Sequence, residues 1–218
     1  MNIVRIKDIF VKDVTIELRQ KYAVGGIALF AASVVFIMYK SFNNINPREW
    51  TILLWIIMLF AGLNAIVKSF LQEKKETYLY YFTLFDPLEL IIARLFYNYL
   101  FMLLLFCVVV FFLSLFSGYP VKDSALFFGG SALGLFGISV IFTFVSVITA
   151  SGQGNTTLMS VLALPLVLPS VLLLLKVTAV SVRLISDTAV TEDLWMLAGV
   201  DLLLSGVLMW LFPVLWKS

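Results

Sequence analysis

The chain has 218 residues, of which 62% are hydrophobic and only 13% are charged, and its mean hydropathy is +1.06. A soluble globular protein carries about twice that share of charged residues, so the composition excludes this class. The net charge of +2 indicates no particular partner, and the single Cys107 excludes a disulfide framework.

Six apolar runs are long enough to cross a membrane. A helix needs about 20 apolar residues to span a hydrocarbon core about 30 Å thick. The runs are too long for strands and lack the alternation of a β-barrel, so we expect helices. We therefore expect one all-α integral membrane domain over residues 1–218, with spans at about residues 23–39, 50–70, 90–116, 125–150, 157–180 and 194–216.

The distribution of Lys and Arg near the span ends predicts the orientation. With a cytoplasmic N-terminus, ten of the fifteen basic residues lie on the cytoplasmic side. We therefore expect both termini in the cytoplasm, together with the segment 72–89 between the second and third spans. The five basic residues expected on the opposite side are Lys40, Arg48, Lys122, Lys176 and Arg183.

Residues 1–22 precede the first span and have an amphipathic pattern. We interpret them as a helix that lies along the membrane interface. The alternative is a solvated helix that only sets the topology. Its apolar face consists of side chains at helical spacing, opposite most of the charged ones: Ile3, Ile6, Phe10, Val14 and Leu18.

The segment 72–89 is a cytoplasmic interruption that is charged at first and aromatic in the middle. It ends at Asp86-Pro87, where a proline suits the first turn of the next helix. We expect a short coupling helix that transmits the movement of a partner to the spans. The alternative is a surface helix whose aromatic side chains lie among lipid headgroups. The candidate coupling residues are Glu73, Glu76, Tyr78, Tyr80, Tyr81, Leu84 and Pro87.

Glycine and proline distinguish the fourth and fifth spans. Gly130 and Gly134 lie four residues apart, which predicts close packing against another helix. In the fifth span, Pro165 and Pro169 share a helix face, and each removes a backbone hydrogen bond. The two prolines predict either a broken helix at a pathway or hinge, or a static kink that shapes the packing.

Polar side chains within apolar spans are candidates for function. Asp201 lies about two turns into the last span, and we expect it to serve the hinge or pathway. Lys176 is a candidate partner for this carboxylate, although extension toward the outer interface explains it equally well. Four further polar residues are expected to cross-link the second and third spans: Asn64, Lys68, Arg94 and Asn98.

The sequence lacks the residues that catalytic and cofactor sites usually need. It contains no P-loop sequence to cradle nucleotide phosphates and no histidine to ligate heme iron. It also contains no Ser/His/Asp set and no metal-binding cluster. We therefore expect neither catalysis nor cofactor binding by this chain alone, with the energy supplied by another subunit.

In chain order, these features resemble a known transporter family. Glu17-Leu18-Arg19 in the N-terminal helix is followed by two spans and by the loop that ends in Leu84-Phe85-Asp86-Pro87. Arg94, the glycine-rich fourth span and a Leu-Pro-Leu-x-x-Pro pattern in the fifth span come next. Over essentially its full length, the chain is similar to the heme exporter protein B (CcmB) family, the ABC-2-type permease subunits of bacterial cytochrome c maturation.

The resemblance implies a division of labour within a complex of the bacterial inner membrane. A separate ATPase subunit would bind ATP and dock on residues 73–85, with two copies each of permease and ATPase. A heme-handling membrane subunit would deliver heme, the possible cargo, to a periplasmic chaperone. ATP would drive either heme export or release of the loaded chaperone. Lipid would surround the spans, and no nucleic-acid partner is expected.

Two other functions remain open from the sequence. A related ABC-2 permease that exports a lipid, glycan or drug would share the same loop and the same N-terminal helix. A six-span membrane scaffold that transports nothing would not need a rigid coupling helix.

Overall fold

A computed structural model describes residues 3–19, 21–41, 45–71, 86–151, 156–185 and 190–217. Within these ranges every regular element is an α-helix, and there is no strand. The helices are α1 (Ile3–Arg19), α2 (Lys21–Ser41), α3 (Pro47–Leu71), α5 (Pro87–Ser117), α6 (Ser124–Ser151), α7 (Thr156–Ser181) and α8 (Val190–Lys217). The expected all-α class is therefore confirmed.

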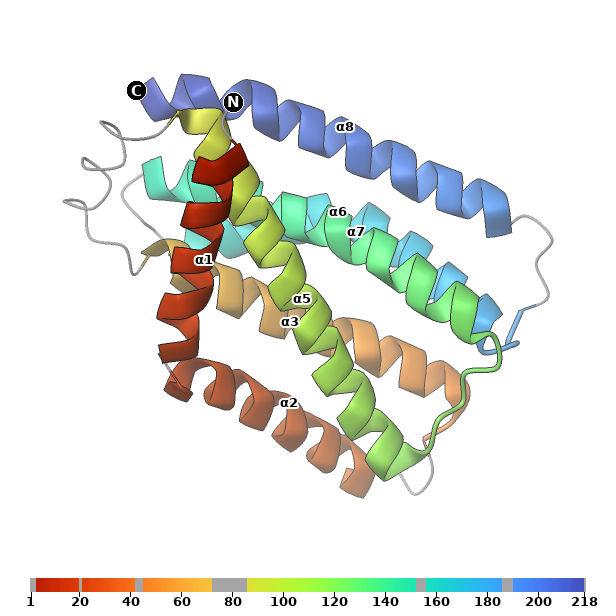
Figure 1. The fold of residues 1–218 in the computed structure, drawn as a ribbon. Helices are drawn as coiled ribbons and strands as arrows, with labels where there is room; N and C mark the ends of the chain where they lie inside the picture. Colours follow the sequence, from red (N-terminus) through yellow and green to blue (C-terminus); the bar gives the residue numbers. More distant parts are fainter. Residues whose placement is uncertain are drawn as a thin grey trace.

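The long helices form a bundle with one short helix across its end. Figure 1 shows α3, α6, α7 and α8 running along one another, while α5 crosses the bundle obliquely. The helix α1 runs across the long helices and packs against α5 and α2. The helix α1 begins and the helix α8 ends toward the same end of the bundle (Figure 1).

Five of the helices are long and apolar enough to cross a membrane. Their apolar stretches match the second to sixth expected spans, and they are Pro47–Ile66, Pro87–Ser117, Ser124–Thr149, Val161–Ser181 and Val190–Pro213. The first expected span, at about residues 23–39, falls within α2. The part of α2 found to be apolar enough is the shorter stretch Leu29–Ser41, so a sixth span stays a prediction.

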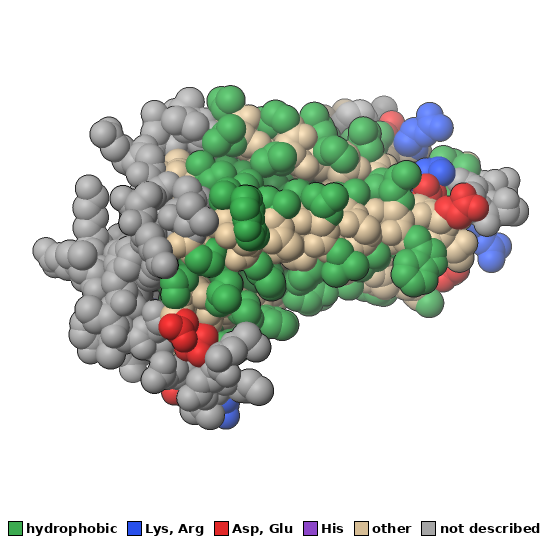
Figure 2. Space-filling model, turned by 90° about the horizontal axis from the view of Figure 1, so that it is seen from above, with side chains coloured by type: hydrophobic (Ala, Val, Ile, Leu, Met, Phe, Trp, Pro, Cys, Tyr) green, Lys and Arg blue, Asp and Glu red, His purple; other side chains and the backbone are tan. Residues whose placement is uncertain are grey.

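The outer surface of the bundle is apolar along its length. Figure 2 shows hydrophobic side chains over the middle of one face, with acidic and basic side chains gathered toward the two ends. Large apolar side chains are widely exposed; Trp195 on α8, for example, is 79% exposed. A soluble protein would not leave so continuous an apolar surface uncovered, whereas lipid covers such a surface in a multi-pass membrane protein.

Local sequence sets where several helices begin. At the start of α3, the Glu49 backbone N–H donates to Asn46 Oδ1 and the Asn46 N–H donates to Glu49 Oε2, both at 3.0 Å. This reciprocal pair is a capping box, with Pro47 in the first helical position. At the start of α6, the Leu126 N–H donates to Asp123 Oδ1 at 3.0 Å. Polar side chains in the loops before the helices thus accept hydrogen bonds from backbone N–H groups that have no partner within the first helical turn.

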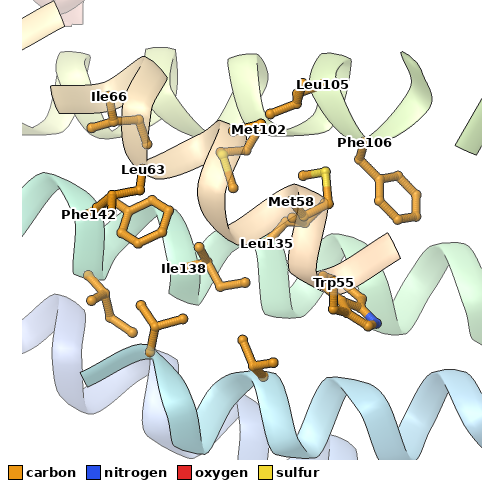
Figure 3. Close-up of a cluster of buried hydrophobic side chains, with 14 of the residues drawn as sticks. Trp55, Met58, Leu63, Ile66, Met102, Leu105, Phe106, Leu135, Ile138 and Phe142 are labelled. Atoms are coloured by element: carbon orange, nitrogen blue, oxygen red, sulfur yellow. The ribbon is translucent and has the colours of Figure 1, made fainter. Parts of the chain in front are cut away.

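The core lies where α3, α5 and α6 meet. Figure 3 shows Trp55 and Met58 of α3 beside Met102 and Phe106 of α5, with Phe142 of α6 close by. The rings of Trp55 and Phe106 are stacked with their centroids 6.2 Å apart. Because lipid tails are as apolar as these side chains, close packing stabilises the core rather than removal from water.

A hydrogen bond ties this core to α7. The Trp55 indole N–H donates to Thr178 Oγ1 at 3.2 Å, and both side chains are buried. Trp50 precedes Trp55 on α3 and is buried as well. Its indole nitrogen, however, has no hydrogen-bond partner among the described residues. The two tryptophans thus offer a matched comparison.

We expect Trp55→Phe to destabilise the protein through loss of this bond. In a double-mutant cycle with Thr178→Val, the coupling free energy should be about 0.6 kcal/mol, the average for such bonds between membrane helices. The measurement is reversible unfolding in mixed micelles. Trp50→Phe, combined with the same Thr178→Val change, should show no coupling. Equal coupling for both tryptophans would contradict the assignment of the bond.

Candidate functional site

Glycines on α6, the expected fourth span, let this helix lie very close to α7. A Cβ atom on Gly130 would lie 2.6 Å from Val177 Cγ1, and one on Gly134 would lie 2.6 Å from Leu174 Cγ. Real Cβ atoms essentially never come so near another atom, so a larger residue at either position would force the facing α7 side chain to shift. The predicted close packing at Gly130 and Gly134 is therefore confirmed, and its partner helix is α7.

The same face of α6 also sets the register of α8. Gly130 lies beside Leu194, and Gly137 lies beside Asp201, so the facing positions are seven residues apart on both helices. Helices that meet at seven-residue intervals pack nearly parallel, as in a coiled coil. The two helices therefore run in the same direction with a fixed register, and Asp201 is placed against Gly137.

Asp201 is the most deeply enclosed acid of α8. Its side chain is 2% exposed, whereas the next two residues, Leu202 and Leu203, are 71% and 65% exposed. A Cβ atom on Gly137 would collide with the Asp201 carboxylate, so this group fills the space that glycine leaves. Neither carboxylate oxygen accepts a hydrogen bond from another side chain among the residues that the structure describes, and the polar neighbour of the carboxylate is the Gly137 backbone.

Lys176 does not pair with Asp201, so this expectation was wrong. The Lys176 Nζ lies 2.8 Å from Asp193 Oδ2, in an ion pair that joins α7 to the first turn of α8. Asp193 precedes Asp201 by eight residues, which is about 12 Å along a helix. The alternative, in which Lys176 extends toward the membrane interface, agrees better with this position near the helix ends.

Asn64 and Asn98 do not cross-link the second and third spans as predicted. The Asn98 side-chain amide donates to Thr143 Oγ1 at 2.8 Å, so it joins α5 to α6. Asn64 is exposed and donates to the Phe60 carbonyl oxygen of its own helix at 2.8 Å. The side chain of Lys68 lies outside the described part of the chain. The rotation of each helix about its axis decided these partners, and sequence spacing could not supply it.

The helix α7 continues without interruption through both prolines. Pro165 and Pro169 lie inside the helix Thr156–Ser181 and are exposed, whereas Ala163 and Val167 on the opposite face are buried. A broken helix is therefore not seen at this position. The role of the two prolines as a hinge stays a prediction.

Of the segment 72–89, expected to be a coupling helix, the described residues are those that enter α5. Pro87 is the first residue of α5, after Asp86 in extended conformation with ψ of 141°, as the Asp86-Pro87 pair predicts. The other candidate coupling residues lie outside the described ranges: Glu73, Glu76, Tyr78, Tyr80, Tyr81 and Leu84.

Two charged residues, which were not predicted as a pair from the sequence, are buried just after the start of α5. Glu89 and Arg94 are 1% and 5% exposed in the first two turns of α5, the helix against which α1 packs. Each makes a polar or electrostatic interaction. The sequence signal that could have indicated this contact between α1 and α5 is the pair of opposite charges, five positions apart, at the start of an otherwise apolar helix.

The bundle, its apolar surface and its enclosed polar groups define a multi-pass α-helical membrane protein. Among the described residues, no group of three or more acids or cysteines is placed to hold a metal ion. A family model described as CcmB protein matches residues 4–213. The chain therefore belongs to the CcmB family, the membrane components of heme export in cytochrome c biogenesis. Neither the curated proteins nor the solved structures contain a match.

The contact between Gly137 and Asp201 can be tested by substitution of the glycine. Gly137→Ala should reduce the free energy of unfolding by about 1–3 kcal/mol, because the added methyl group forces the Asp201 carboxylate out of its place. Gly129→Ala is the matched control, since a Cβ atom there meets no atom within 4 Å. Equal loss of stability in the two variants, measured by unfolding in micelles, would contradict the close approach of α6 and α8.

Proposed function

We propose that this protein is the transmembrane permease subunit of an ABC transporter complex for cytochrome c maturation. It couples ATP hydrolysis by a separate ATPase subunit to movement of its membrane helices. The work is either export of heme or release of a heme-loaded periplasmic chaperone. The membership of the chain in the CcmB family supports the process, and the position of α5 supports the coupling.

The observation that carries the proposal is the connectivity of α5. This helix begins at Pro87, where the segment 72–86 joins the bundle. From there it packs against α1, α2, α3, α6 and α8. A force applied to the segment therefore enters the helix that contacts most of the bundle. The buried Glu89 and Arg94 hold its first turns within the protein, so the helix would move with its neighbours.

We also propose six spans, with α2 as the first and both termini in the cytoplasm of a bacterial inner membrane. The two termini lie at one end of the bundle, which an even number of spans requires (Figure 1). The excess of Lys and Arg on the side of the N-terminus supports a cytoplasmic position for that end. In this orientation, residues 72–86 face the cytoplasm, where an ATPase subunit would be found.

The complex would contain a second copy of the permease, two ATPase subunits, a heme-handling membrane subunit and the periplasmic chaperone. ATP would be bound by the ATPase and heme would be the cargo. The chain contains no histidine, the usual heme ligand, so we assign it the mechanical step and assign stable heme binding to a partner.

Docking of the ATPase can be tested through the apolar positions of the segment. Changing Tyr80, Tyr81 and Leu84 together to Glu should reduce copurification of the ATPase by about tenfold or more, as loss of about 1.4 kcal/mol or more of binding free energy implies. The control is Tyr119→Glu, an exposed position just past the far end of α5. If the triple variant retained the ATPase as fully as Tyr119→Glu did, the proposed docking site would be wrong.

The process can be tested by deletion of the gene. Mature c-type cytochromes, measured by heme staining of membrane proteins, should be lost, whereas export of lipids, glycans and drugs should continue. Complementation with the intact gene should restore the cytochromes. Normal cytochromes together with a defect in another export would favour a different ABC-2 permease. Unchanged export of every kind would favour a scaffold.

A further inference from the structure

Asp201 is enclosed in the contact between α6 and α8. The carboxylate is 2% exposed, lies against the backbone of Gly137 and accepts no hydrogen bond from another side chain among the described residues. It lies eleven positions into α8 and beside the middle of α6, so it is far from both ends of the bundle. Such a group stands where neither bulk water nor lipid headgroups reach it.

The helices around Asp201 supply no cation to balance its charge. The whole of α6 contains no charged or other titratable side chain, and α7 contains only Lys176, which pairs with Asp193. On α5, Arg94 and Glu89 lie in the first two turns, and neither is bonded to Asp201. The remaining titratable groups on these helices are Tyr97, Tyr99 and Cys107 on α5, and Glu192 and Lys217 on α8.

An ionised carboxylate in this position would be costly, because burial removes its hydration and no partner replaces it. The neutral acid avoids most of that cost, since it carries no net charge. The packed contact therefore favours the protonated form. When α8 moves away from Gly137, water can reach the carboxyl group, and the proton can leave.

We propose that Asp201 is a proton-binding site within the membrane, and that its occupancy is linked to the contact between α6 and α8. The packed helices hold the proton, and their separation releases it. By linkage, a group that binds a proton more tightly in one state also favours that state when the proton is bound. This site goes beyond the proposed function, because it requires neither a particular cargo nor a docked ATPase.

The protonation state of Asp201 can be observed directly by infrared difference spectroscopy on the full chain in lipid nanodiscs. At neutral pH the wild-type protein should show the C=O stretch of a neutral, buried carboxyl group. Asp201→Asn should lack this band, and Glu192→Gln, at an exposed acid on the same helix, should keep it. Absence of the band from the wild-type protein, or its persistence in Asp201→Asn, would overturn the proposal.

Stability as a function of pH gives an independent test. The packed state binds one more proton than the separated state, so wild-type stability should fall as the pH rises from about 4, the ordinary titration range of an aspartic acid, toward neutrality. This decline should be absent in Asp201→Asn, which resembles the neutral acid in shape, and should persist in Glu192→Gln. Identical pH profiles for all three proteins would contradict the proposal. Failure of Asp201→Asn to fold would do so too, because the neutral side chain should be accepted.

Discussion

The close approach of α6 to its neighbours is the constraint on which the rest of the bundle depends. In lipid, apolar side chains gain little by meeting each other, so helices associate where small residues let their backbones come near. Gly130, Gly134 and Gly137 provide that contact on one face of α6. Through these glycines α7 packs closely on one side of α6, and α8 is held in a fixed register on the other side. In that register Asp201 is buried against Gly137. The ion pair between Lys176 and Asp193 then joins α7 to α8 beyond the glycines.

The helix α5 links this packed region to the end of the bundle where α1 lies. It begins at Pro87 and contacts α1, and farther along it is tied to α6 by the hydrogen bond from Asn98 to Thr143. A displacement of the first turn of α5 therefore has a continuous route of packed and hydrogen-bonded groups to α6, and from α6 to α8. This route supports the proposal that a membrane subunit without nucleotide-binding residues is moved by a separate ATPase.

Features encoded over short distances could be predicted from the sequence. Hydrophobic length predicted the helical class and five of the spans, Asp86-Pro87 predicted the start of α5, and the glycine spacing predicted close packing. The partners of Lys176 and Asn98 could not be predicted, because they depend on the rotation of each helix about its own axis. In a nearly uniform apolar sequence, periodicity gives little indication of that rotation. Residues 72–85 of the expected coupling segment lie outside the described ranges, so the sequence remains the basis for the proposed role of that segment.

The central claim is that force from an ATPase reaches the contact between α6 and α8. The most direct measurement is the distance between spin labels at two exposed positions, residue 129 on α6 and residue 202 on α8, in the assembled complex. The exposed Cys107 would first be replaced by serine. We predict that the distance distribution changes when ATP is added to the complex and stays constant in the isolated permease. An unchanged distribution in a complex that hydrolyses ATP would contradict the claim.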